Sequence, residues 1–253
     1  MKKAIITGAS GGIGLAVARR LAEQNYALTL VARNEEKLKE VLLDLGGRHQ
    51  MLVADLSEHD GLAILIDHLA SNNYDVLTNN AGNGTYGEFL NINLENQIST
   101  MRLNMDAVVA LSFAFLKKAT PGSALVNIGS LLAHTSMPGG AVYAATKSFV
   151  ASFSESLWYE FKKKGIFVMG FNPGAADSEF HANAGRHTKD FPAFVVSSVA
   201  DVADELVAAL KKRSKPRVVQ GFKNRLMLFG FRFLNRAMAI RIMGQISPGL
   251  AGA

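Results

Sequence analysis

Tyr143 and Lys147 lie four residues apart and could together move a proton. On a helix, residues with this spacing share one face, so the phenol and the ammonium can point into one site. A nearby ammonium favours the phenolate, and the spacing therefore predicts that Lys147 lowers the pKa of Tyr143 from about 10. Such a tyrosine could serve as proton donor in the reduction of a carbonyl, or as acceptor in the oxidation of an alcohol.

A glycine-rich turn near the N-terminus, TGASGGIG at residues 7–14, offers a place for a dinucleotide. It lies between a predicted strand at 4–7 and a predicted helix at 13–24. Small residues let the backbone approach a pyrophosphate, and the helix N-terminus favours its negative charge. The spacing is GxxxGxG and not the commoner GxGxxG, so the turn alone is also compatible with an ordinary tight turn.

Short β-rich runs alternate with helical stretches along most of the chain, and its 253 residues suit one domain. The alternation predicts an α/β fold with a parallel, doubly wound sheet covered on both faces. Further strands are expected at 27–32, 50–53, 76–78, 124–128, 166–171 and 218–219. Further helices are expected at 35–45, 94–117, 142–164, 201–213 and 222–243.

The composition and the spacing of residues exclude several kinds of catalytic and metal site. There is no cysteine, which excludes disulfides, thiolate catalysis and cysteine metal sites. No carboxylate and histidine group has metal-ligand spacing, so no metal is expected. The apolar run after the first three residues is too short for a signal peptide, and no stretch reaches the length of a membrane span. We therefore expect a cytoplasmic protein.

The chain resembles the short-chain dehydrogenases/reductases over about residues 3–178, because five motifs occur in that family's order. They are TGASGGIG at 7–14, NNAG at 79–82, Ser130, YAATK at 143–147, and Pro173-Gly174. The resemblance implies a Rossmann-type doubly wound sandwich with a seven-stranded parallel sheet. It also implies one dinucleotide-binding catalytic domain over 1–253 and a catalytic tetrad of Asn104, Ser130, Tyr143 and Lys147.

The resemblance gives each tetrad member a role. Tyr143 would exchange a proton with the substrate oxygen, and Ser130 would hold that oxygen by a hydrogen bond. Lys147 would lower the tyrosine pKa and hydrogen-bond the nicotinamide ribose, and Asn104 would organise water that links Lys147 to solvent. Each residue alone is also compatible with a structural role, such as a loop cap for Ser130.

The expected cofactor is NADP(H), and Arg33 decides this because it follows the second predicted strand. An acid there would bind the ribose 2′-hydroxyl, whereas a guanidinium can grip a 2′-phosphate with two hydrogen bonds. The alternative is a surface Arg33 paired with Glu35 or Glu36. The expected cofactor-binding residues are Gly8, Ser10, Gly12, Ile13, Gly14, Arg33, Asp55, Asn80, Ala81, Gly82, Tyr143, Lys147, Pro173, Gly174 and Ser178.

Asp55 and Ser178 have particular expected contacts with the cofactor. By resemblance Asp55 would touch the adenine, and its alternative is a helix cap. Ser178 stands where the family commonly has threonine, but it keeps the hydroxyl that would contact the carboxamide.

Residues 175–198 break the alternation and are expected to form a substrate lid. The lid contributes Phe180, Phe191, Phe194, Val195 and Val196. These side chains favour a lipophilic carbonyl or secondary alcohol as substrate, unless they simply form core or an interface. His181 and His187 lie in the same segment and are given no role.

The C-terminal extension at 216–253 is basic and apolar. The last acid is Glu205, and residues 206–253 hold ten Lys/Arg and no Asp/Glu. A helix at 222–243 would place Arg225, Arg232 and Arg236 close to one face. The extension could pack over the substrate pocket or a subunit contact, or lie peripherally on an anionic membrane. Nucleic acid binding is not expected, since the aromatic residues here are all Phe in an apolar setting.

The leading hypothesis is an NADP(H)-dependent oxidoreductase that moves a hydride between the nicotinamide and a carbonyl or secondary alcohol. Its partners would be a small-molecule substrate and further copies of the chain. The helices at 94–117 and 142–164 would pair into a homodimer or homotetramer, as they often do in the family. The alternatives are an NADP-binding regulatory protein without turnover and a sugar-nucleotide epimerase.

Overall fold

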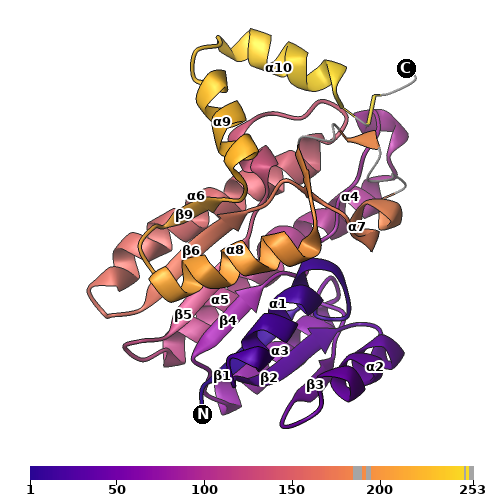
Figure 1. Ribbon diagram of the computed structural model, residues 1–253. Helices are drawn as coiled ribbons and strands as arrows, with labels where there is room; N and C mark the ends of the chain where they lie inside the picture. The colour runs from indigo at the N-terminus through magenta and orange to yellow at the C-terminus, as the bar shows by residue number, and fades with distance from the viewer. Residues whose placement is uncertain (185–189, 192–194, 248, 251–253) are drawn as a thin grey trace.

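A computed structural model describes residues 1–184, 190–191, 195–247 and 249–250. Among these residues, seven strands form one sheet in the order β3-β2-β1-β4-β5-β6-β9, and all neighbouring strands are parallel. The order reverses between β1 and β4, which makes the sheet doubly wound (Figure 1). The strands are β1 (Lys3–Thr7), β2 (Ala27–Ala32), β3 (Gln50–Val53), β4 (Val76–Asn79), β5 (Ala124–Ile128), β6 (Phe167–Asn172) and β9 (Arg217–Val219). The predicted fold is confirmed.

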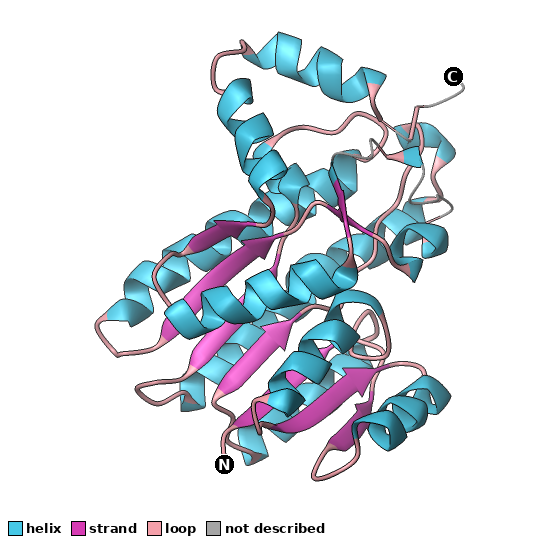
Figure 2. Cartoon of the chain, in the orientation of Figure 1, coloured by secondary structure: helices cyan, strands magenta, loops and turns pink. Residues whose placement is uncertain are grey.

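Helices cover both faces of this sheet (Figure 2). In β1, Ala4 and Ile6 belong to one core cluster and Ile5 to the other, because successive side chains of a strand point to opposite faces. The covering helices are α1 (Gly12–Glu23), α2 (Glu35–Leu45), α3 (His59–Ser71), α4 (Leu94–Met101), α5 (Ala107–Lys118), α6 (Ala141–Lys162) and α8 (Val199–Lys212). Both faces of the sheet are therefore apolar, as is typical of a parallel sheet covered by helices on both sides.

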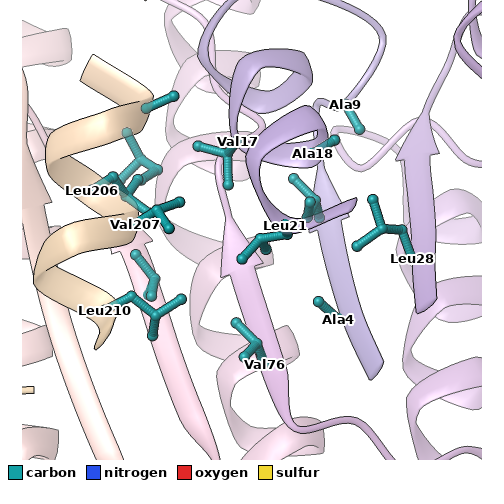
Figure 3. Packing of buried hydrophobic residues seen from close by; sticks show 14 of the residues in the cluster. Ala4, Ala9, Val17, Ala18, Leu21, Leu28, Val76, Leu206, Val207 and Leu210 are labelled. Atoms are coloured by element: carbon teal, nitrogen blue, oxygen red, sulfur yellow. The ribbon is translucent and has the colours of Figure 1, made fainter. Parts of the chain in front are cut away.

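Helices α1 and α8 pack side by side on one face. Val17 and Leu21 of α1 meet Leu206 and Leu210 of α8 above the strands (Figure 3). Helix α8 begins at a side-chain cap, in which the Ser198 hydroxyl accepts a hydrogen bond from the Asp201 N–H at 3.1 Å. Burying each leucine contributes about 2 kcal/mol, so this contact fixes α1 firmly on the sheet.

The helical stretch expected at 94–117 is interrupted. Between α4 and α5, residues Arg102–Asp106 form a π-helical segment. The wider turn places Asn104 in the interior, where its side chain is 1% exposed.

The prediction of a single helix at 222–243 is wrong. The structure has α9 (Phe222–Phe231) and α10 (Arg236–Gln245), joined by a turn. The Asn235 side chain starts α10 by accepting a hydrogen bond from the Met238 N–H at 2.9 Å. As a result Arg225 and Arg236 do not share a helical face: Arg225 lies 2.6 Å from Glu205, and Arg236 donates to the Ser136 hydroxyl.

Three small elements and the C-terminal helices complete the carboxyl side of the sheet. Strand β7 (Ala175–Ala176) pairs with β8 (Val196–Ser197), and α7 (Glu179–Asn183) lies between them in sequence. Short 3-10 turns η1 (Phe89–Asn91) and η3 (Leu131–His134) precede α4 and α6. Helices α9 and α10, orange to yellow at the top of Figure 1, stand clear of the sheet layers. None of the described helices is long and apolar enough to cross a membrane.

Candidate active site

A cleft lies at the carboxyl ends of β1, β4, β5 and β6, beside the point where the strand order reverses. In open parallel sheets this is where ligands bind. It is lined by most of the predicted site residues, namely Gly8, Ser10, Gly12, Ile13, Asn80, Ala81, Gly82, Ser130, Tyr143, Lys147, Pro173, Gly174 and Ser178. Arg33 and Asp55 line an adjoining hollow that shares Gly8, Ser10, Ala81 and Gly82 with the cleft. Gly14 and Asn104 do not line the cleft and lie behind its wall.

The glycine turn leaves the start of α1 open to this cleft. Gly11 is the N-cap and lines the cleft, and within the described chain α1 has neither a side-chain cap nor an acidic residue in its first turn. Gly8 and Gly12 have φ values of +66° and +53°, which residues other than glycine rarely adopt. The turn thus supplies the unpaired N–H donors and the bare backbone that a pyrophosphate needs.

Gly14 and Asn80 hold the turn from behind. A Cβ on Gly14 would lie 2.2 Å from the Gly8 carbonyl oxygen and 2.5 Å from Asn80 Nδ2. Asn80 Nδ2 donates to the Thr7 and Gly8 carbonyls at 2.9 and 3.2 Å. Thr7, which sequence reasoning missed, accepts hydrogen bonds from the Asn80 and Ala81 N–H groups through its hydroxyl, both at 2.9 Å. The ends of β1 and β4 are therefore locked together.

Tyr143 and Lys147 lie on α6, and both side chains are buried. The Tyr143 and Ser130 hydroxyls are hydrogen-bonded to each other. Lys147 Nζ donates to the Ile128 carbonyl at 3.0 Å and lies 5.7 Å from the centre of the Tyr143 ring. The structure therefore brings these three predicted residues into one corner of the cleft.

The predicted lowering of the Tyr143 pKa is wrong in this structure. Burial raises the pKa of Tyr143 to about 12, and the hydrogen bond with Ser130 opposes this only in part. Burial also lowers the pKa of Lys147 to about 8, and its ammonium is bound to a carbonyl oxygen. Loss of water around the phenol outweighs the hydrogen bond from Ser130, so Tyr143 holds its proton at neutral pH.

Asn104 and Lys147 approach each other behind Gly82. Asn104 Nδ2 donates to the Asn83 carbonyl at 2.9 Å and to the Thr146 hydroxyl at 3.1 Å, and its Oδ1 accepts from the Asn83 N–H. A Cβ on Gly82 would lie 3.0 Å from Asn104 Oδ1 and 3.4 Å from Lys147 Nζ. A glycine is therefore what lets the two polar side chains come this close.

Ser130 combines the two roles considered for it. Its hydroxyl bonds to Tyr143, and the same oxygen accepts a hydrogen bond from the Leu132 N–H at the start of η3. Its own N–H donates to Asn172 Oδ1 at 3.2 Å. Asn172, which the sequence did not single out, thus fixes the backbone of Ser130.

Arg33 does not pair with its neighbours in sequence. Its side chain is 72% exposed, and its Nη1 lies 3.9 Å from Asp55 Oδ2. Glu35 and Glu36 instead pair with Lys39 at 3.0 and 3.2 Å. Asp55 accepts hydrogen bonds from the N–H and hydroxyl of Ser57 and does not cap α3, whose N-cap is Glu58.

Aromatic side chains surround the outer side of Tyr143. Phe180 and Tyr86 lie 5.7 and 5.9 Å from the Tyr143 ring, and Phe191 lies 5.9 Å from Tyr86, all between ring centres. Helices α9 and α10 add Met227 and Met243, and Ile246 follows them. The cleft wall is thus apolar on this side. Of the predicted lid, Val195 lines it and Val196 lies in β8, while Phe194 and His187 lie outside the described residues.

One ion pair at the cleft was not anticipated. Lys37 of α2 and Glu179 of α7 both line the cleft, and Lys37 Nζ lies 2.8 Å from Glu179 Oε2. The two residues are far from each other in sequence, so no local pattern could have indicated the contact. In the part of the chain that is described, no group of three His, Asp or Glu residues could hold a metal ion.

Most of this chain matches a family of known proteins. The sequence profile of the short chain dehydrogenase family matches residues 2–189. The chain belongs to the short-chain dehydrogenase/reductase family. Members of this family are oxidoreductases that use a nicotinamide cofactor, and the glycine turn and cleft of this chain fit such a group.

Individual relatives agree with this placement. The chain is 29% identical over 224 residues to an uncharacterized oxidoreductase of Staphylococcus epidermidis, covering 86% of this chain and 94% of the relative. It is 33% identical over 184 residues to sulfoacetaldehyde reductase 2 of Chromohalobacter salexigens, covering 70% and 73%. A short-chain dehydrogenase from Sphingobium yanoikuyae in complex with NADPH superimposes with a TM-score of 0.81 at 30% identity, covering 92% and 93%.

Proposed function

We propose that this protein is an NADP(H)-dependent oxidoreductase that interconverts a lipophilic carbonyl compound and its secondary alcohol. The observation that carries the proposal is the meeting of Tyr143, Ser130 and Lys147 in one buried corner. This corner lies between an open glycine turn and an apolar wall. A dinucleotide on the turn and an apolar substrate against the wall would both reach it.

Tyr143 is proposed as the proton donor to the carbonyl oxygen. Burial keeps its phenol protonated at neutral pH, which suits the reducing direction. Ser130 would hold the same oxygen, because its hydroxyl is already hydrogen-bonded to the phenol. When bound, the nicotinamide would supply or accept the hydride.

Lys147 and Asn104 would support this proton transfer from behind. Lys147 would bind the nicotinamide ribose and stabilise the phenolate left on Tyr143. Asn104 lies beside it across Gly82, in a position to hold water that returns a proton. Gly8, Ser10, Gly12 and Ile13 would hold the pyrophosphate, and Gly14 would support their turn from behind. Asn80, Ala81, Gly82, Pro173, Gly174 and Ser178 would lie along the rest of the cofactor.

The preference for NADP(H) rests on Arg33. Its guanidinium is exposed, is not paired with Glu35 or Glu36, and borders the hollow next to the glycine turn. Asp55, whose Oδ2 lies 3.9 Å from Arg33 Nη1, would contact the adenine. The NADPH in the Sphingobium yanoikuyae structure supports the same choice.

The substrate class rests on the apolar wall. Tyr86, Phe180 and Phe191 lie around Tyr143, and α9 and α10 close the cleft with Met227 and Met243. Burial of apolar substrate surface against these side chains would favour lipophilic ketones over sugars. We propose residues 175–198 as the lid over this side.

Tyr143→Phe tests the mechanism. It removes one hydroxyl from the buried corner, and turnover of a carbonyl panel, followed by NADPH absorbance, should fall by at least about a thousandfold. NADPH affinity should survive. Tyr86→Phe is the matched control, since it removes a second phenol hydroxyl from the same cleft and should change turnover far less. Turnover of Tyr143→Phe close to that of the wild type would exclude the mechanism. A broad panel without any turnover in the wild type would favour the regulatory alternative.

Arg33→Asp tests the cofactor. The change removes the phosphate partner and adds a like charge, so NADPH affinity should fall about a hundredfold or more while NADH affinity changes little. Arg48→Asp makes the same charge change at another exposed position and should leave both affinities unchanged. An unaltered NADPH to NADH ratio in Arg33→Asp would exclude the assignment.

Assembly through α5 and α6 is also proposed. Phe113 of α5 and Tyr159 of α6 are large side chains that are 70% and 74% exposed. A homodimer or homotetramer that pairs these helices would cover them. Analytical ultracentrifugation should then detect a dimer or tetramer, and a monomer at micromolar concentration would exclude this assembly.

A further inference from the structure

The outer side of α9 carries a stripe of large apolar side chains that face solvent. Phe222, Leu226, Phe229 and Phe233 are 71%, 58%, 55% and 77% exposed. At 3.6 residues per turn the first three share one helical face. Phe233 extends the stripe past the helix end, since its ring meets that of Phe229 edge-on at 5.3 Å between centres. We call these four residues the α9 stripe.

The opposite side of α9 is also mainly apolar, apart from the buried Asn224, but it is covered by protein. Met227 lines the cleft, and Phe231 packs against a buried cluster that contains Met137 and Met243. A helix that is apolar around most of its circumference is normally buried on all of those sides. In the described chain, α9 has such cover only on its inner side. The α9 stripe is therefore open to an apolar partner that the described residues do not supply.

Positive charge flanks the α9 stripe on both sides. Around the helix, Lys223 follows on one side of the stripe and Arg232 on the other, and both are exposed. Neither forms an ion pair among the described residues. The last acid in the chain is Glu205, and it is already paired with Arg225. The surroundings of the stripe therefore attract an anionic partner.

We propose that the α9 stripe docks on an anionic lipid surface. Such a surface offers both things that the stripe lacks: an acyl boundary for Phe and Leu, and negative head groups for the flanking cations. A second copy of the chain fits less well. A twofold contact between two stripes would bring Lys223 and Arg232 of both copies together, with no acid of this region to compensate.

Docking here would bring the lipid close to the cleft. One helix, about 10 Å across, separates the α9 stripe from Met227 in the cleft wall. The proposed docking does not depend on hydride transfer, and vesicle binding can be measured without turnover.

Vesicle co-sedimentation of the full chain tests the proposal. The probes are vesicles of phosphatidylcholine with phosphatidylglycerol and vesicles of phosphatidylcholine alone. At low salt, the protein should bind the anionic vesicles at least about tenfold more tightly than the neutral ones, and high salt should reduce this binding. No binding to anionic vesicles at low salt would overturn the proposal.

Two pairs of variants localise the binding. Leu226→Ser with Phe229→Ser removes apolar contact and should weaken binding by about tenfold or more, whereas Leu43→Ser, which is 83% exposed on α2, should not. Lys223→Glu with Arg232→Glu should also weaken binding by about tenfold or more. The matched control, Lys117→Glu with Lys163→Glu, changes the net charge equally at the ends of α5 and α6, away from the cleft, and should have a much smaller effect.

Thermal unfolding checks that every variant is folded, and the charge variants keep the proposal testable if the serine variants are not. Equal weakening by the test and control pairs would overturn it, because binding would then follow net charge alone. A dimer that dissociates when Leu226 and Phe229 become serine would also overturn it and would make the α9 stripe a subunit contact.

Discussion

Helices α1 and α9 both line the cleft, and both begin at a glycine without a side-chain cap or an acid in the first turn of the described helix. They are nevertheless held in opposite ways. The first turn of α1 meets the end of β1 backbone to backbone, with Gly14 close to the Gly8 carbonyl. Helix α9 is held by side chains, such as Glu205, which accepts a hydrogen bond from the Gly221 N–H.

This difference separates two tasks within one cleft. The pyrophosphate is common to all dinucleotides. A turn whose shape is set by its backbone can bind this group whatever the substrate is. A substrate wall of Met, Phe and Ile side chains can be altered residue by residue while the sheet and α1 stay intact. The profile of the family ends at residue 189, before α9 begins, which agrees with this division.

Gly14→Ala should have the largest effect on the fold. The added methyl group would lie 2.2 Å from the Gly8 carbonyl oxygen, so β1, α1 or Asn80 must move. We expect a loss of about 3 kcal/mol or more in the free energy of unfolding, measured with urea. If this variant is as stable as the wild type, α1 is not held by the close backbone contact at Gly14, and the proposed difference between α1 and α9 is wrong.

Lys147→Met tests the cost of the buried charge. Below pH 8 the ammonium is charged in both the folded and the unfolded chain. The free-energy cost of burying this charge in the folded state is therefore largest there. Since its folded pKa is about 8 and its reference value is 10.5, the unfolded chain binds more protons between these limits. The wild type should therefore gain about 2–3 kcal/mol relative to Lys147→Met as pH rises from 8 to 10.5.

Urea unfolding at pH 7.5, 9 and 10 measures this gain. Lys223→Met, on the exposed flank of α9, is the matched control and should show no comparable trend. A stability difference for Lys147→Met that is independent of pH would show that the ammonium is not strongly desolvated.

Gly230→Ala should have the smallest effect, and of the opposite sign. Among the described residues, no atom beyond its chain neighbours and its own helix lies within 4 Å of a Cβ placed there. Alanine favours the helix over glycine, so we expect a gain of about 0.5–1 kcal/mol. A loss comparable to that of Gly14→Ala would mean that α9 is packed as tightly as α1.

The sequence predicts the sheet well because its signals are local. Runs of apolar residues bounded by glycines mark β1 and α1, and the motif residues follow the ends of strands, which a parallel sheet gathers at one edge. This accounts for the meeting of Gly8, Asn80 and Ser130 in one cleft.

What the sequence missed depends on contacts between distant residues. Lys37 and Glu179 are separated by most of the chain, and neither carries a pattern that indicates the other. The tyrosine pKa was predicted from spacing to Lys147, but burial decides it, and spacing does not report burial. The break before α10 was missed because Asn235 reads as a tolerable helix residue until its side chain is seen to cap the next helix.

The contact between Gly139 and Gly249 offers a means of sorting related sequences. A Cβ on Gly249 would lie 2.0 Å from the Gly139 carbonyl oxygen, and the Ser247 hydroxyl donates to the neighbouring Pro138 carbonyl at 2.5 Å. One partner lies within the residues that the family profile matches and the other lies beyond them. Related chains with glycine at both positions should fold their tails back over the cleft in the same way. A side chain at either position would identify a relative whose tail runs elsewhere.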